Sequence, residues 1–471
     1  MKNITLEDII RVTQGELICG GKQKDLICEH YCFDSRKLKE GEVHVGIPGE
    51  EINGGIFYEE ALKRGAIGCI IQDIEIPEEQ RKKYTNQFII KVPDTLKALA
   101  QIAIYKRSLY PDLKVIAVTG SVGKTSTKDL IASVVSQKYT TLKTQGNFNN
   151  QIGVPMTILS LTNQEALVIE MGMNHQGEIS ELTKMAKPNI CVITNVGTSH
   201  IGNLGSRENI LKAKLEILEG CKEKEIVINN DNDMLHGWYE KEKNNKTMHI
   251  HTFGIHNDSQ ILAQNIQEQE EGSSFELLEH EGKNAKIFVP VGGEHFVYNA
   301  LCAIAVGKIL HLNIEQIKQG IATFELTHKR MEITQKDGYT IMNDAYNASY
   351  ESMKASLGYI STKYENNRKI AVLGDMLELG NFAEELHKKV GKEVAQSNID
   401  ILICAGENSK YIIEEAEKQG MQKENIYYFH EEEQNQKIIQ LLKKILQKDD
   451  VVLIKASNSM KFFKIAEEIL K

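Results

Sequence analysis

A glycine loop lies between an apolar run and a helical pattern in the stretch 114–128, KVIAVTGSVGKTSTK. The run Val115–Val118 is apolar and rich in β-branched residues, as buried parallel strands are. Beyond the loop, apolar residues recur at helical spacing between positions 124 and 138. Strand, loop and helix in this order place backbone N–H groups at a helix N-terminus, where they can bind an anion.

The residue types of this loop suit a nucleoside triphosphate. Gly120 and Gly123 allow close backbone approach, Lys124 can neutralise β/γ-phosphates, and the Thr125 hydroxyl can coordinate Mg²⁺. Val118 stands where the general Gly-x-x-x-x-Gly-Lys-Thr motif has its first glycine, so a chance glycine turn stays an alternative. We predict that ATP is bound by Gly120, Ser121, Val122, Gly123, Lys124, Thr125 and Ser126.

Composition narrows the class of protein. The 471 residues suggest two to four domains, and 41% hydrophobic with 26% charged residues is ordinary for a globular chain. The chain has no run of eighteen apolar residues and no apolar leader, so we expect no membrane insertion and a cytoplasmic location. A net charge of −9 argues against a nucleic-acid partner. Eight cysteines without a Cys-x-x-Cys pair are expected to be reduced thiols.

Strands alternate with helices throughout, which predicts an α/β protein. We expect three domains: a small N-terminal α/β domain over 1–110, a central P-loop ATPase-like parallel sheet with helices over 111–324, and a C-terminal Rossmann-like α/β domain over 325–471. The strands expected in the last two are 115–118, 167–169, 191–194, 226–228, 249–253, 340–342, 369–373, 399–404 and 451–454.

Polar residues follow two of the central strands. Glu170 comes directly after 167–169, and His200 follows 191–194 by a short loop. The carboxyl ends of parallel strands share one sheet edge, where a carboxylate can complete a Mg²⁺ shell. An ordinary strand-end acid and a structural histidine are the alternatives. The amide-rich loop 145–155 can either bind a polar ligand or form Asx turns.

Several motifs together resemble the Mur ligase family, and the resemblance runs nearly from end to end. The shortened P-loop Thr-Gly-x-x-Gly-Lys-Thr of that family accounts for the glycine missing at position 118. The similar segments are 119–125, 147–155 (NFNNQIGVP), 170–178 (EMGMNHQGE), 195–200, 212–216 (KAKLE), 343–348 (NDAYNA) and 372–380 (VLGDMLELG) with His387.

The resemblance implies a cytoplasmic ligase with a UDP-substrate-binding domain, a central ATPase and a C-terminal lid. It would join D-Ala-D-Ala to UDP-MurNAc-tripeptide through an acyl phosphate, giving UDP-MurNAc-pentapeptide for peptidoglycan and ADP. We expect a monomer. A sister ligase adding one amino acid is the nearest alternative, although its Asp-Asn-Pro-Arg signature is absent. A P-loop phosphotransferase or a non-catalytic nucleotide-binding protein is less favoured.

The resemblance also implies roles for individual residues. Lys124, Lys214 and His200 would be catalytic, with Thr125 and Glu170 holding one Mg²⁺ and His200 a second. Lys214 would be carbamylated and stabilise the second metal, whereas its sequence context alone is that of an exposed helix lysine. Asn299, Arg330 and Asp344 would contact ATP. The substrate would be bound by Ser35, Arg36, Asn147, Asn149, Asn150 and Asn347.

The chain departs from the family pattern at Phe296, Ser349-Tyr350, Asn458 and 53–55, and none of these changes removes an implied metal or phosphate ligand.

Overall fold

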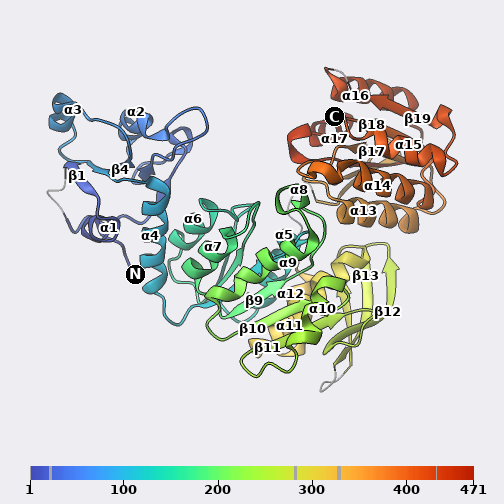
Figure 1. Ribbon diagram of the computed structural model, residues 1–471, viewed down its shortest axis with the longest axis horizontal. Coiled ribbons are helices and arrows are strands. Elements are labelled where there is room, and N and C mark those ends of the chain that lie inside the picture. The colour runs from blue at the N-terminus through green and yellow to red at the C-terminus, as the bar shows by residue number, and fades with distance from the viewer. Residues whose placement is uncertain (1, 21–23, 280–283, 326–329, 431) are drawn as a thin grey trace.

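Three β-sheets with covering helices lie along the chain in the computed structural model, which describes residues 2–20, 24–279, 284–325, 330–430 and 432–471 (Figure 1). The α/β class expected from the sequence is confirmed. The first and last sheets lie at opposite ends of the molecule, with the second between them (Figure 1). The domain bounds near 110 and 325 stay a prediction. Among the described helices, none has both the length and the apolar content that crossing a membrane requires.

The N-terminal sheet has the strand order β1-β5-β4-β3-β2, and only β1 runs antiparallel to its neighbour. Helix α4 connects this sheet to the next one, and it begins where the Asp94 side chain accepts the Lys97 N–H. It packs against both α1 and the central helices α6 and α7. The elements are α1 (Leu6–Thr13), β1 (Glu16–Cys19), β2 (Tyr31–Cys32), η1 (Ser35–Lys37), β3 (Val43–Val45), η2 (Gly54–Phe57), α2 (Tyr58–Lys63), β4 (Gly68–Ile71), α3 (Glu78–Lys83), β5 (Phe88–Lys91) and α4 (Thr95–Ser108).

The central sheet has the order β14-β13-β12-β11-β10-β9-β6-β8-β7. Its strands run parallel from β7 to β12, which confirms the predicted parallel sheet over β6, β8, β9, β10 and β11 and adds β7 and β12, which were not predicted. The strands β8 and β9 are buried throughout because helices cover both faces. The elements are β6 (Lys114–Thr119), α5 (Lys124–Val135), β7 (Thr141–Lys143), α6 (Gly153–Leu159), β8 (Ala166–Glu170), α7 (Glu178–Ala186), β9 (Ile190–Ile193), α8 (Ile201–Leu204), α9 (Arg207–Leu215), η3 (Glu216–Gly220), β10 (Glu225–Asn229), α10 (Asp233–Glu242), β11 (His249–Gly254), β12 (Ile261–Gln269), β13 (Gly272–Glu279), β14 (Ala285–Val289), α11 (Glu294–Ile309) and α12 (Ile314–Ala322).

The antiparallel strands β13 and β14 are an addition that the sequence pattern did not predict. The exposed half of β12 carries a run of polar side chains, so it lacks the apolar signal of a buried strand. Such a strand is identified by its partner rather than by its own periodicity.

The C-terminal sheet has the order β15-β16-β20-β17-β18-β19, parallel except for the β15–β16 pair. Its predicted strands are confirmed, although β18 begins two residues later than expected. We call this sheet and its helices the lid. The elements are β15 (Glu332–Lys336), β16 (Tyr339–Asn343), α13 (Tyr350–Lys363), β17 (Lys369–Gly374), η4 (Gly380–Phe382), α14 (Ala383–Gln396), β18 (Ile401–Ala405), α15 (Lys410–Lys418), η5 (Lys423–Asn425), β19 (Ile426–Phe429), α16 (Gln434–Ile445), β20 (Val451–Lys455), η6 (Asn458–Met460) and α17 (Phe463–Ile469).

Candidate active site

The glycine loop joins the C-terminal end of β6 to the N-terminus of α5. Gly123 is the N-cap of α5 with φ of 82°, and no side chain caps the helix, so its first N–H groups face the loop. The Lys124 ammonium donates to the carbonyls of Gly120 at 2.8 Å and Ser121 at 3.3 Å. Burial lowers the pKa of Lys124, while the charge of Glu170 opposes this shift. The loop therefore presents a cation and free N–H groups to an anion.

Gly120 is required by both backbone conformation and space. Its φ is 155°, and a β-carbon would lie 1.9 Å from the Thr194 hydroxyl oxygen. We expect Gly120→Ala to lower the free energy of unfolding by at least about 2 kcal/mol, because strain and overlap add. Equilibrium urea unfolding measures this. Gly358→Ala on α13 is the control, since a β-carbon there meets open space; equal effects of the two substitutions would contradict the packing argument.

Glu170 lies at the end of β8, next to the glycine loop, as the strand pattern predicted. Its Oε2 accepts the Thr125 hydroxyl at 2.9 Å, and its Oε1 accepts the Asn149 amide at 2.8 Å. Its backbone N–H donates to the Thr144 hydroxyl at 3.0 Å. Arg330 donates to the Thr125 hydroxyl at 3.0 Å. The buried carboxylate is thus held in one orientation, with hard oxygen atoms grouped beside the loop.

The loop after β9 is hydrogen-bonded to the glycine loop. The Thr194 hydroxyl and the Asn195 amide donate to the Val122 carbonyl at 2.8 and 2.9 Å. The Asn195 side-chain oxygen accepts the Val122 N–H at 2.9 Å. His200 ends this loop with φ of 63°, and its Nδ1 lies 2.6 Å from Oε2 of Glu378 in the lid. His200 therefore reaches the predicted sheet edge but faces a lid carboxylate there.

Lys214 lies on α9 with its side chain only 2% exposed, while Lys212 is exposed. Burial lowers the pKa of Lys214 well below its ordinary value, the charge of Lys124 lowers it further, and Glu351 opposes the shift. In the described part of the chain, no hydrogen bond or ion pair is formed by its Nζ. The alternative of an exposed helix lysine therefore applies to Lys212 and not to Lys214.

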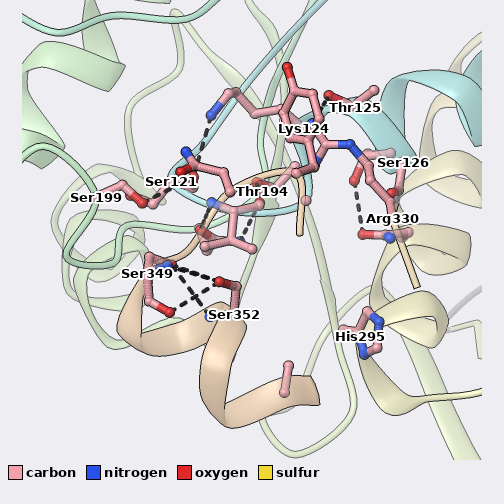
Figure 2. A pocket seen from close by; sticks show the side chains of 18 of the residues that line it. Ser121, Lys124, Thr125, Ser126, Thr194, Ser199, His295, Arg330, Ser349 and Ser352 are labelled. Carbon is pink, nitrogen blue, oxygen red and sulfur yellow. Dashed lines mark hydrogen bonds between the residues drawn. The ribbon is translucent and has the colours of Figure 1, made fainter. Parts of the chain in front are cut away.

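A cavity of about 420 Å³ lies between the glycine loop and the lid. Figure 2 shows Lys124 and Thr125 on one side and Ser349, at the start of α13, on the other. Other predicted residues on its wall are Glu170, His200, Asn299, Arg330, Asp344, Asn347, Asn147 and Asn149. The cavity therefore combines residues of the central sheet and of the lid.

Three of these wall residues are held by specific contacts. The Asn299 side-chain oxygen accepts the Thr127 hydroxyl at 2.9 Å, which joins α11 to the first turn of α5. The Arg330 guanidinium stacks 4.0 Å above the Tyr346 ring. Asp344 accepts the Ser356 hydroxyl and forms a buried ion pair with Lys455.

Five predicted residues do not line the cavity, namely Gly120, Lys214, Ser35, Arg36 and Asn150. Ser35 is buried in η1, and Arg36 is exposed and paired with Asp34 at 2.8 Å. Asn150 accepts the N–H groups of Ile152 and Gly153 at 3.1 and 3.0 Å, which is the Asx turn considered above.

The sequence analysis missed several residues of the site. Thr144 and Glu351 lie in segments without a motif. Glu378 lies in the segment 372–380 without an assigned role, and Lys455 directly follows the predicted strand 451–454. Lys455 follows the same rule that found Glu170, since it ends the buried strand β20. Glu351 and Glu378 carry no such signal, because their partners lie in another domain.

Comparison with known proteins agrees with this arrangement. Residues 118–307 match the Mur ligase middle domain, and residues 329–458 match the Mur ligase glutamate ligase domain. The UDP-N-acetylmuramoyl-tripeptide--D-alanyl-D-alanine ligase of Bacillus subtilis (strain 168) is 36% identical over 99% of this chain and 98% of its own. The chain belongs to the Mur ligase family. The enzyme of that name from Escherichia coli (strain K12) is 32% identical to this Mur ligase, over 88% of each chain.

Solved structures resemble this Mur ligase along its whole length. MurF from Acinetobacter baumannii superposes with a TM-score of 0.85 at 28% identity, covering 99% of both chains. MurF ligase from Thermotoga maritima in complex with ADP gives 0.79 at 26% identity, covering 94% of this Mur ligase and 97% of that chain.

Proposed function

We propose that this Mur ligase joins D-Ala-D-Ala to UDP-MurNAc-tripeptide, converting ATP to ADP and phosphate and giving UDP-MurNAc-pentapeptide for peptidoglycan. The observation that carries the proposal is the near-complete coverage of relatives with this activity in their names. The cavity supports it, because the glycine loop and residues of the lid both line it, as a site that encloses ATP and a second substrate requires. The UDP-linked substrate and ATP suit a cytoplasmic location.

The chemistry needs an activated carboxylate. The terminal carboxylate of the tripeptide attacks the γ-phosphorus, ADP leaves, and an acyl phosphate forms. The amine of D-Ala-D-Ala then attacks the acyl carbon, loses a proton, and displaces phosphate, which carries away one carboxylate oxygen. Lys124 and the N–H groups of α5 bind the phosphates, and Arg330 adds positive charge beside Thr125. The lid excludes the water that would hydrolyse the acyl phosphate.

The residues present fit Mg²⁺. Thr125 and Glu170 offer hard oxygen atoms that would hold Mg²⁺, and phosphate and water oxygens would complete its ligands. The described residues hold no cluster of three His, Cys, Asp or Glu that could bind a metal, which agrees with a site completed by substrate. Bound Mg²⁺ supplies charge that screens the triphosphate from the attacking carboxylate. His200 would hold a second Mg²⁺ ion after the Glu378 carboxylate has moved away from its Nδ1 atom.

Carbamylation of Lys214 is part of the proposal. CO₂ reacts with an unprotonated amine, and burial favours that form of Lys214. The carbamate would replace the positive charge of Lys214 by a negative one, in the field of Lys124 and Glu351. We also propose that the UDP-linked substrate is bound by Ser35, Arg36, Asn147, Asn149, Asn150 and Asn347. Arg36 would give up its ion pair with Asp34 and pair with the diphosphate of the substrate. The contact between Phe33 and Phe148, with ring centroids 6.3 Å apart, brings the Arg36 loop close to the amide loop.

Acceptor-dependent phosphate release tests the function. Purified protein is given ATP, Mg²⁺ and UDP-MurNAc-tripeptide with D-Ala-D-Ala, D-Ala, L-lysine or diaminopimelate. We expect release only with D-Ala-D-Ala. Release with one free amino acid would move the acceptor assignment to a sister ligase. Release without any acceptor would favour an ATPase, and no release with any acceptor would favour a phosphotransferase or a non-catalytic binding protein.

A further inference from the structure

Glu351 connects the lid to a loop of the central domain. It is the second residue of α13, and its Oε1 accepts the Thr198 N–H at 2.8 Å. Its Oε2 accepts the Thr198 hydroxyl at 3.1 Å. Both carboxylate oxygens are therefore used by one residue of another domain, and the reaction described above gives Glu351 no role.

The neighbouring Gly197 leaves room for this carboxylate. A β-carbon on Gly197 would lie 2.5 Å from the carboxyl carbon of Glu351. The backbone of Gly197 is not in the left-handed region, so its conformation would accept other residues. A side chain at this position would therefore displace the Glu351 carboxylate.

The same loop contacts the glycine loop from its other side. The Gly197 N–H donates to the Ser121 hydroxyl oxygen at 2.9 Å, and the Ser199 hydroxyl donates to the Ser121 carbonyl at 3.3 Å. Only the Gly197–Thr198 segment therefore separates the lid carboxylate from the phosphate-binding residues. Glu378 contacts the helix that follows this loop, since its carbonyl accepts the N–H of Gly202 in α8 at 3.0 Å.

We propose that Glu351 is a positioning residue that makes the shape of the glycine loop depend on lid closure. With the lid docked, Glu351 fixes Gly197–Thr198, and Gly197 in turn fixes Ser121. Without this contact, Ser121 loses a fixed neighbour and the loop samples other conformations. The consequence for turnover rests on the proposed function, whereas the effect on loop order does not.

Hydrogen exchange of the free protein tests the positioning directly. In Glu351→Ala, peptides covering 119–123 and 196–199 are expected to exchange about tenfold faster, because two hydrogen bonds across the domains are lost. Glu351→Gln keeps both contacts, since its oxygen accepts the N–H and its amide donates to the hydroxyl, and we expect near-normal exchange. Glu365→Ala, an exposed acid just beyond α13, is the control.

Unchanged exchange at 119–123 in Glu351→Ala would overturn the proposal, whatever the activity. If Glu351→Gln behaved like Glu351→Ala, charge rather than positioning would be responsible, which also overturns it. If exchange is faster in Glu351→Ala but the wild-type protein forms no product, the proposed function is wrong and the positioning role stands.

Kinetics provide a second test through Gly197. Gly197→Ala and Glu351→Ala should each lower kcat about tenfold, equivalent to about 1.4 kcal/mol. Because both act on one contact, the double variant is expected to lose no more than either single variant. Additive losses would show that the two residues act separately and would contradict the proposal.

Discussion

Lys124→Ala is expected to lower kcat by about 10³-fold or more, because the reaction develops charge on phosphate oxygens that this cation stabilises. The fold should persist, since the hydrogen bonds that the Lys124 ammonium forms with described residues all go to two carbonyls of its own loop. Phosphate release under saturating ATP gives the rate, and thermal unfolding checks the fold. Lys184→Ala, an exposed lysine on α7, serves as the control.

Near-normal turnover by Lys124→Ala would remove the glycine loop from the proposed site. A loss accompanied by unfolding would assign the residue a structural role instead. We expect Lys124→Ala to be inactive and still folded.

Lys214→Ala is expected to lower kcat by about 10²-fold or more, with part of the activity restored by formate or acetate, which can occupy the space of a carbamate. Lys212→Ala on the same helix should behave as wild type because its side chain is exposed. The measurement is phosphate release with and without the added carboxylate. An active Lys214→Ala enzyme, or one that no small acid rescues, would contradict the carbamate proposal.

The burial of Lys214 also predicts an effect on stability. Its pKa is lowered in the fold, so the unfolded chain binds the proton more tightly. The burial of Lys214 therefore lowers the free energy of unfolding at neutral pH, and this loss of stability becomes smaller as the pH rises towards the ordinary pKa of lysine. Lys214→Met, compared in CO₂-free buffer, should be more stable than wild type by about 1 kcal/mol at pH 7 and should lose this advantage near pH 10. A Lys214→Met variant that is less stable than wild type at pH 7 would contradict this prediction.

The sequence predicted those parts of the fold whose signal is local. Buried parallel strands such as β6, β8 and β9 are continuous apolar runs, and the rule that their carboxyl ends meet brought Glu170 and His200 to one edge. The strands β13 and β14 were missed because half-exposed antiparallel strands depend on their neighbours.

Contacts between domains were the part that sequence reasoning could not reach. Glu351 and Thr198 lie 153 positions apart, and no periodicity relates them. Lys214 differs from Lys212 only by its direction on α9, and the helix pattern alone could not decide which side chain is buried. The family resemblance singled out Lys214, and the structure supplies the burial that makes its chemistry reasonable.

Oxygen transfer tests the central claim most directly. UDP-MurNAc-tripeptide labelled with ¹⁸O in its terminal carboxylate is incubated with ATP, Mg²⁺ and D-Ala-D-Ala, and both products are analysed by mass spectrometry. The account predicts UDP-MurNAc-pentapeptide together with phosphate that carries one ¹⁸O, because the carboxylate oxygen leaves with the phosphate. Unlabelled phosphate, or labelled phosphate without pentapeptide, would contradict amide formation through an acyl phosphate at this site.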